Sequence, residues 1–206
     1  MKTKPYFNFL LLLTLISGSA VDVLAYKILY AEQFYELYHL HLTQSPDDTI
    51  ENIIWLQQSL KADFANPLNA LATIKTKEEW RYYQNLFRMH VNILLTQQHM
   101  TLGSKFDKFN AYFYNAPWAW ANIDSLNKAE RAYKTATAYW EEAKRWSNLA
   151  TTEKIIGINL EEIQYWEDQN YRIETGDFDY RFIIAQHLER LSKVKNEFQK
   201  MDETTY

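Results

Sequence analysis

The chain has 206 residues, with 22 basic and 26 acidic side chains, and its formal net charge at pH 7 is −4. A mildly acidic chain without a basic block argues against nucleic acid or an anionic lipid surface as the main partner. No cysteine occurs, which excludes disulfides and thiolate metal sites within this sequence. Four glycines and four prolines are too few for the tight turns of a many-stranded sheet, so we expect an all-α fold.

Residues 1–25 have the pattern of a cleavable signal peptide. Lys2 and Lys4 precede an apolar run over residues 6–16, and the small residues 17–20 follow. Basic, apolar and small segments in this order are what a signal peptidase recognises. Cleavage after Ala20 or Ala25 fits, and we favour Ala25. The alternative is a retained anchor, but a run of about 11 residues is short of the roughly 20 that span a bilayer. We therefore expect a periplasmic protein.

The first two helices are predicted over residues 27–43 and from Ser45 to about Ala62. Ser45 can cap the second helix, with Pro46 at its first position. Apolar residues at helical spacing predict that the second helix buries Ile50, Ile53, Ile54 and Leu56, together with Trp55 or Leu60. Because the connection is short, the two helices should form an antiparallel hairpin.

A connector over 63–68 and a short helical turn within 68–74 lead to a long third helix. Thr76 and Glu79 have the spacing of a capping box at its start, and Gly103 is a plausible stop. Residues 104–122 lack a clear helical period. The next helix is predicted from Asn122 or Asp124 to about Leu149, with alanines alternating with large aromatics so that neighbouring helices can interlock.

The C-terminal part predicts two further helices. Thr151 or Thr152 should break the preceding helix, and Asn159 with Glu162 resembles a second capping box. That helix should run to about Ile173 and end at Gly176, after which Asp177 caps the last helix. We therefore expect residues 26–201 to form a single domain of about six helices in antiparallel hairpins, either a tetratricopeptide-like α-solenoid or a helical bundle, with a polar tail over 202–206.

The sequence offers little for catalysis or for metal and cofactor binding. His39 and His41 point to different faces of one helix, and His90 and His99 also diverge, so these histidines read as surface or boundary residues. Neighbouring carboxylates such as Glu78 and Glu79 suit a first helical turn and its dipole better than a glycosidase site. We expect no enzyme activity, no cofactor and no metal site.

Residues 103–120 form the candidate site, because this long connector is crowded with aromatic rings. Such rings can act as anchors that bind a partner. The alternative is that the segment packs across the helix ends and closes the core, and a carbohydrate platform is a third possibility. The candidate partner-binding residues are Phe106, Phe109, Tyr112, Phe113, Tyr114, Trp118 and Trp120.

Three stretches within residues 27–150 resemble a family of exported helical proteins of spirochaetes: residues 63–72, 102–108 and 111–118, the last reading Ala-Tyr-Phe-Tyr-Asn-Ala-Pro-Trp. The family is similar to the periplasmic flagellar collar proteins, which resemble tetratricopeptide scaffolds. The resemblance implies a structural role in motor assembly and motility, with other periplasmic proteins as partners and no catalytic residues.

Two hypotheses of different classes follow from these observations. The first is a non-enzymatic periplasmic scaffold or adaptor, such as a flagellar collar component. The second is a periplasmic saccharide-binding or cell-wall-modifying protein, which requires a deep cleft with a buried carboxylate. A protein that uses the aromatic segment to bind its own copies is a further option.

Overall fold

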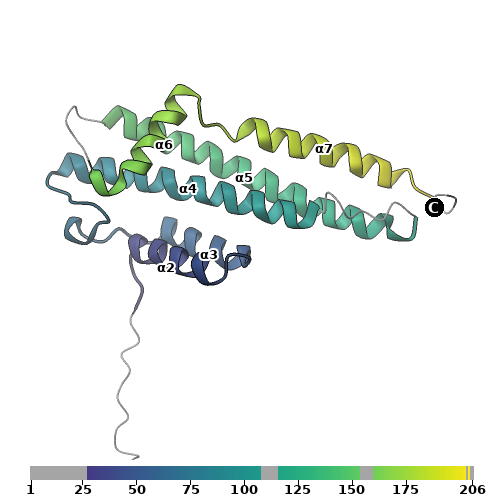
Figure 1. The fold of residues 1–206 in the computed structure, drawn as a ribbon, viewed down its shortest axis with the longest axis horizontal. Coiled ribbons are helices and arrows are strands. Elements are labelled where there is room, and N and C mark those ends of the chain that lie inside the picture. Colours follow the sequence, from purple (N-terminus) through teal and green to yellow (C-terminus); the bar gives the residue numbers. More distant parts are fainter. Residues whose placement is uncertain (1–26, 108–115, 154–159, 203, 205–206) are drawn as a thin grey trace, which may run out of the picture.

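The structure is a computed structural model, and it describes residues 27–107, 116–153, 160–202 and 204. These residues form α-helices joined by short 3₁₀ turns and contain no named strand, which confirms the all-α prediction (Figure 1). The predicted signal peptide lies outside the described residues. The α-helices are α2 (Ala31–Gln44), α3 (Thr49–Lys61), α4 (Lys77–Asp107), α5 (Ala119–Glu153), α6 (Gln164–Thr175) and α7 (Arg181–Gln199), and the 3₁₀ turns are η1 (Pro67–Asn69), η2 (Ala116–Trp118) and η3 (Glu161–Ile163).

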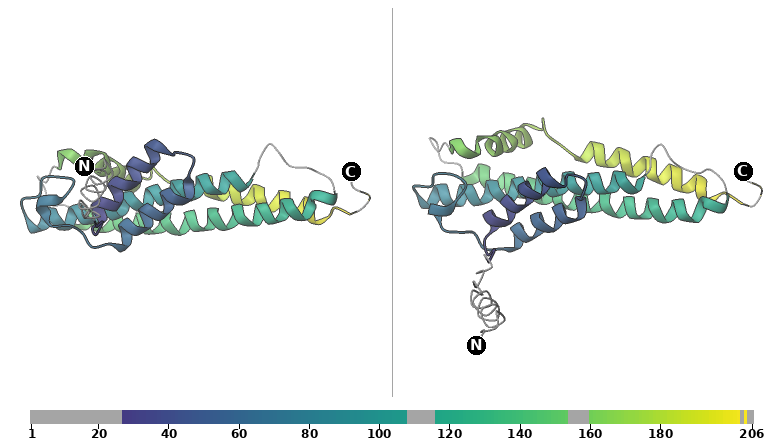
Figure 2. Two further views of the ribbon diagram at one scale, coloured as in Figure 1. Left: turned by 90° about the horizontal axis from the view of Figure 1, so that it is seen from below. Right: turned by 60° about the horizontal axis from the view of Figure 1, so that its bottom comes forward.

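A long antiparallel hairpin of α4 and α5 is the central element of the molecule. At 31 and 35 residues, these helices extend for about 46 and 52 Å at 1.5 Å per residue. The α2–α3 hairpin and α6 lie against the half that holds the start of α4, and α7 runs along the other half (Figures 1 and 2). This is a long hairpin flanked by shorter helices, and the tetratricopeptide-like stacking is not confirmed.

The two halves have separate cores. In the larger one, aromatic rings from α2, α4, α5 and α6 interlock, with Phe87, Trp140 and Trp166 among its buried members. The smaller core lies between α5 and α7 and includes Leu126, Tyr133, Ile184, Leu191 and Phe198. The ring of Tyr180, in the α6–α7 connection, packs against both cores.

The α2–α3 hairpin has the predicted topology but different ends. Asp48 caps α3, because its Oδ1 accepts a hydrogen bond from the Glu51 amide at 3.1 Å, so the prediction of a Ser45 cap is wrong. Ile53 and Leu56 are buried as predicted. Ile50 and Ile54 are more than 40% exposed, at 54% and 45%, because they lie on the outer side of α3, away from α2 and α4.

The start of α4 is confirmed in detail. The Glu79 amide donates to Thr76 Oγ1 at 3.0 Å, and the Thr76 amide donates to Glu79 Oε2 at 2.9 Å, which completes a capping box. The helical turn predicted within 68–74 is instead the short η1, Pro67–Asn69.

The predicted stop of this helix at Gly103 is wrong. α4 continues to Asp107, and Gly103 is buried against the ring of Tyr133 in α5. A Cβ at position 103 would lie 2.6 Å from Tyr133 Cε1, a distance that real contacts do not reach. The glycine therefore permits a close approach of two helices instead of ending one.

α5 is longer at both ends than the sequence predicts. Thr151 and Thr152 do not break it, because their hydroxyls donate to the carbonyls of Ser147 and Asn148 four residues earlier. The predicted capping residue Asn159 lies outside the described residues.

The two C-terminal helices match the prediction in order but not in capping. Gly176 ends α6 with a left-handed φ of 81°, as predicted. Asp177 does not cap α7, which begins after Tyr180. Its carboxylate instead accepts from the Thr175 hydroxyl. Within the described ranges no helix is both long and apolar enough to cross a membrane.

Candidate functional site

The candidate aromatic residues lie at the end of the α4–α5 hairpin where α4 ends and α5 begins. Phe106 is in the last turn of α4, Trp118 is in η2, and Trp120 is in the first turn of α5. Phe109, Tyr112, Phe113 and Tyr114 are predicted site residues that lie outside the described residues. The structure therefore brings three of the seven predicted residues to one end of the molecule, on the side where α7 ends (Figure 1).

Phe106 faces inward, as the core-closing alternative predicts. Its ring is half-buried against the smaller core, and the Lys128 ammonium lies 5.9 Å from the ring centroid. Ser125 Oγ donates to the Phe106 carbonyl at 2.6 Å, which ties the end of α4 to α5. Phe106 thus holds the hairpin end in place.

The two tryptophans face outward. Trp118 is 51% exposed and Trp120 is 74% exposed, although large aromatic side chains usually lose most of their exposure on folding. Tryptophan is also among the residues that most often dominate protein interfaces. This end of the hairpin therefore presents two exposed apolar rings.

A buried charge pair joins the end of α4 to α7. Asp107 is only 2% exposed; its carboxylate pairs with the Arg190 guanidinium of α7 and accepts from the Tyr133 hydroxyl at 3.2 Å. The stacking of Tyr133 on His187, with ring centroids 4.8 Å apart, adds a second contact between α5 and α7. α4, α5 and α7 are thereby joined near the end of α4.

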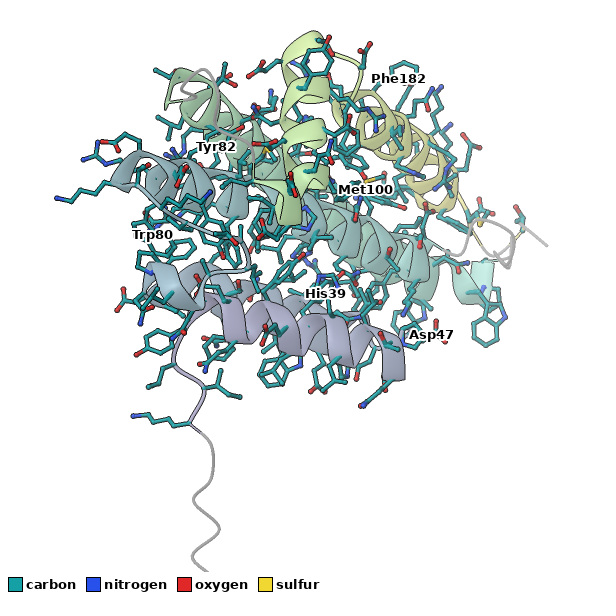
Figure 3. The ribbon with its side chains drawn as sticks, turned by 60° about the vertical axis from the view of Figure 1, so that its left-hand side comes forward. His39, Asp47, Trp80, Tyr82, Met100 and Phe182 are labelled. Atoms are coloured by element: carbon teal, nitrogen blue, oxygen red, sulfur yellow. The ribbon has the colours of Figure 1, made fainter. Side chains whose placement is uncertain are left out.

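Other large apolar side chains are also exposed, and the sequence did not predict that they lie at the surface. They follow the same helical periods as the core residues, so no signal in the sequence separates them from it. They include Leu40, Ile50 and Ile54 on the α2–α3 hairpin, Tyr165 and Tyr171 on α6, and Phe182 at the start of α7, which is labelled in Figure 3.

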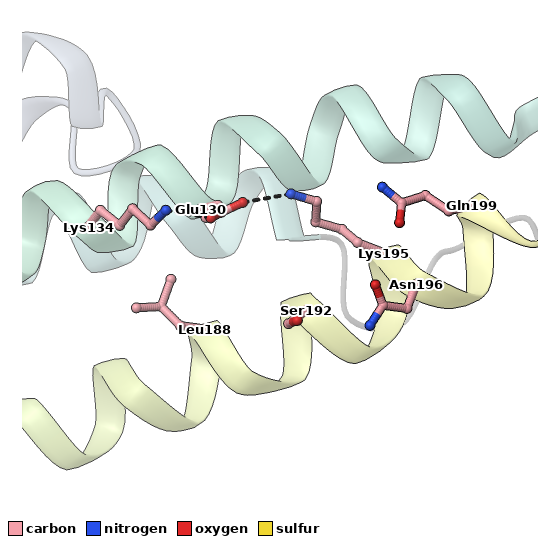
Figure 4. Close-up of a pocket in the computed structure, with 7 residues that line it drawn as sticks. All are labelled: Glu130, Lys134, Leu188, Ser192, Lys195, Asn196 and Gln199. Carbon is pink, nitrogen blue, oxygen red and sulfur yellow. Dashed lines mark hydrogen bonds and ion pairs between the residues drawn. The ribbon is translucent and has the colours of Figure 1, made fainter.

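A pocket of about 250 Å³ lies between α5 and α7 (Figure 4). Glu130 accepts from Lys195 at 2.6 Å and pairs with Lys134 at 2.6 Å, and these two hydrogen bonds lower the pKa of Glu130 to about 2. Both ammonium groups are engaged by this one carboxylate, so the cluster holds α5 and α7 together.

Two histidines predicted at the surface or boundary are buried instead. His90 Nδ1 lies 2.7 Å from Gln169 Oε1, and its Nε2 lies 3.0 Å from the Tyr35 hydroxyl. His99 stacks on Tyr139 with ring centroids 5.3 Å apart. Burial lowers the pKa of each imidazole to about 4, so both are neutral packing residues at pH 7.

Of the described residues, a single group of three could hold a metal ion. It consists of His41 in the last turn of α2, the α3 cap Asp48, and Glu51 in the first turn of α3. The histidine spacing considered in the sequence gave no reason to expect it, because two of its members are carboxylates of the neighbouring helix.

Residues 78–201 match a protein-family model described as "Domain of unknown function (DUF8513)". The match begins in the first turn of α4 and ends just after α7, so it includes both helices of the central hairpin and excludes α2 and α3. No curated protein and no solved structure matches the chain. Because the matched segment spans more than half of the 206 residues, the chain belongs to the DUF8513 family.

Proposed function

We propose that this protein is a non-enzymatic scaffold or adaptor of the periplasm that binds another protein through the end of its α4–α5 hairpin. The single observation that carries the proposal is the exposure of Trp118 and Trp120 where α5 begins. Rigid, exposed tryptophans bind a partner with little loss of side-chain entropy.

The shape of the molecule also supports a scaffold. The α4–α5 hairpin is about 50 Å long, and shorter helices flank both of its halves (Figure 2). A molecule this long can bind one partner at the end of the hairpin and other partners along its length. The resemblance to exported spirochaetal proteins suggests a place in the collar of the periplasmic flagellar motor, where assembly and motility would depend on it.

The saccharide-binding alternative needs a carboxylate that faces a cleft, and two buried carboxylates can be considered. Glu32 accepts from the Ala65 amide at 3.0 Å, and burial raises its pKa. Asp107 is engaged by Arg190 and Tyr133. We assign both to holding elements together, and no observation favours a saccharide site.

The test is cross-linking in intact cells of the source bacterium, followed by mass spectrometry of the captured proteins. We expect the Trp118→Ala/Trp120→Ala variant to capture at least about tenfold less of its main partner, because interface anchors contribute about 2 kcal/mol or more each. Tyr171→Ala is the matched control, since this α6 ring is 62% exposed but distant from the hairpin end.

Equal capture by the wild type and the double tryptophan variant would refute the proposed surface. The collar assignment has a separate test, because it predicts that a deletion strain swims poorly and has an incomplete motor. A deletion strain with an intact motor and normal swimming would end that assignment, while leaving a scaffold role elsewhere to the cross-linking result.

A further inference from the structure

The turn between α2 and α3 brings three side chains with metal-ligating atoms together. One ligand atom from each of His41, Asp48 and Glu51 lies within 4.8 Å of the other two. The turn is at the end of the α2–α3 hairpin, where Figure 3 labels Asp47. His41 is 17% exposed and Glu51 is 45% exposed, so the group is shielded on the histidine side and open to solvent on the other.

A buried amide outside this group orients the imidazole. Asn52 is fully buried, and its Oδ1 lies 2.8 Å from His41 Nδ1. Because an amide oxygen only accepts, Nδ1 carries the proton and the lone pair of the neutral ring is on Nε2. Metal-binding histidines typically donate their second ring N–H to an oxygen in this way, which fixes the tautomer and the direction of the ligating nitrogen.

The ligating nitrogen of His41 faces an acceptor. Nε2 lies 3.6 Å from Glu51 Oε2, which is longer than a hydrogen bond between nitrogen and oxygen. Ligands of a tetrahedral zinc ion, at about 2.0–2.2 Å from the metal, are about 3.4 Å apart. The separation between these two atoms therefore fits two ligands that share a cation.

The remaining ligand is on the same turn. Asp48 caps α3 through Oδ1, so its other carboxylate oxygen is the one to offer to a metal. The Lys105 ammonium of α4 donates to the main-chain carbonyl of Asp47, so this hydrogen bond does not involve any of the three ligand side chains. Two carboxylates and a neutral imidazole carry a net charge of −2, which a divalent cation balances.

We infer that His41, Asp48 and Glu51 form a zinc-class site, with water completing the coordination. One imidazole nitrogen with two carboxylate oxygens suits zinc and similar transition metals, whereas calcium and magnesium prefer oxygen ligands alone. Bound metal would join the last turn of α2 to the first turn of α3. This goes beyond the proposed scaffold function, because the three ligands lie outside residues 78–201 and include neither tryptophan.

The test is titration of the untagged chain, residues 26–206, with Zn²⁺ by isothermal calorimetry, alongside Co²⁺ titration followed by visible absorption. We expect one Zn²⁺ per chain and the absorption of low-symmetry, four-coordinate Co²⁺. His41→Gln should weaken binding at least about tenfold, and Glu51→Gln, which changes an exposed side chain, should do the same. Millimolar Ca²⁺ or Mg²⁺ should not compete.

Matched controls are available on the same helix. His39→Gln and Glu36→Gln remove an exposed histidine and an exposed carboxylate of α2 that are outside the group, so they should bind Zn²⁺ like the wild type. Circular dichroism checks that each variant is helical. Absence of stoichiometric Zn²⁺ binding by the wild type, or unchanged affinity in both His41→Gln and Glu51→Gln, would overturn the site, and equal competition by Ca²⁺ would overturn its zinc class.

Discussion

At the scale of single residues, the contacts that fix this structure are made by side chains whose partners are distant in the sequence. Gly103 lies against the ring of Tyr133, 30 positions later, where a larger side chain would not fit. His90 is held by hydrogen bonds with Tyr35 and Gln169. In each case the residue type is suited to a particular neighbour and not to its own helix. Substitutions at these positions should therefore give effects that helix propensity does not predict.

Replacing Gly103 with alanine should destabilise the protein by about 1–3 kcal/mol, as overpacked cores usually are. Helix propensity alone would predict a gain of about 1 kcal/mol. The Tyr133 ring is fully buried, held by Asp107 and stacked on His187, so it cannot move aside for a methyl group. Urea denaturation followed by circular dichroism measures the change, and Ser104→Ala on the exposed side of the same turn is the control. A Gly103→Ala protein as stable as the wild type would contradict the close approach.

Acid should destabilise the fold through His90. Its pKa is about 4 in the folded state and about 6.5 when unfolded, so the unfolded chain binds more protons between these values. The contribution of neutral His90 to stability is therefore fully present above pH 6.5. The free energy of unfolding falls by up to about 3 kcal/mol as the pH drops from 6.5 to 4.

The pH series should be measured by urea denaturation from pH 7.5 to 4.5 for the wild type and His90→Gln. The variant should be less stable at pH 7 but lose less stability on acidification, because the titrating ring is gone. His99→Gln tests the second buried imidazole in the same way, since its pKa is also about 4. Parallel curves for all three proteins would show that neither histidine titrates as its burial predicts.

At the scale of elements, the connection between α6 and α7 is fixed by one carboxylate. Asp179 Oδ1 accepts from the Trp140 indole N–H of α5 at 3.0 Å and from the Arg181 amide at 2.9 Å. Hydrogen bonds from Arg181 lower the pKa of Asp179 to about 2. Because Trp140 is fully buried, its N–H needs this partner.

Asp179→Ala should therefore cost about 1–3 kcal/mol, the usual cost of leaving a buried donor without an acceptor. Asp177→Ala is the matched control, two residues earlier in the same connection, where the carboxylate is exposed and bonds only locally to Thr175. It should change stability by less than about 0.5 kcal/mol. Thermal and urea unfolding measure both variants, and equal losses would show that the link to Trp140 is not what matters.

At the scale of the whole molecule, the middle of α4 is the most enclosed segment. Between Leu86 and Thr96 most side chains are buried, and α3, α5 and α6 all pack on α4. A helix that is buried nearly all round behaves as the core of the molecule. The α2–α3 hairpin, by contrast, covers only one side and exposes Leu40, Ile50 and Ile54.

Hydrogen exchange measured by mass spectrometry should reflect this difference. Amides in the middle of α4 and the facing part of α5 should exchange slowest, at the rate of global unfolding. Amides of α2 and α3 should exchange at least about tenfold faster, since the hairpin can detach while the α4–α5 hairpin persists. Uniform protection across all the helices would instead indicate a single cooperative unit.

The sequence by itself determined the all-α class, the order of the helices, the Thr76–Glu79 capping box and the Gly176 stop. These depend on local composition, periodicity and contacts within a few residues, which a sequence displays directly. The sequence did not show that Ile50 and Ile54 are exposed. It also did not show that Gly103 permits a close helix contact and does not end the helix. Both depend on where another helix lies, and helical period says which residues share a face but not which face is covered.

The same distinction applies to the candidate sites. The aromatic segment was visible in the sequence, but only the tertiary structure decided that Phe106 faces inward while Trp118 and Trp120 face outward. The grouping of His41 with Asp48 and Glu51 likewise requires the fold of the α2–α3 turn, together with Asn52 to orient the imidazole. The physical reason is that a site depends on the directions and distances of side chains from different elements, and the packing of the helices sets these.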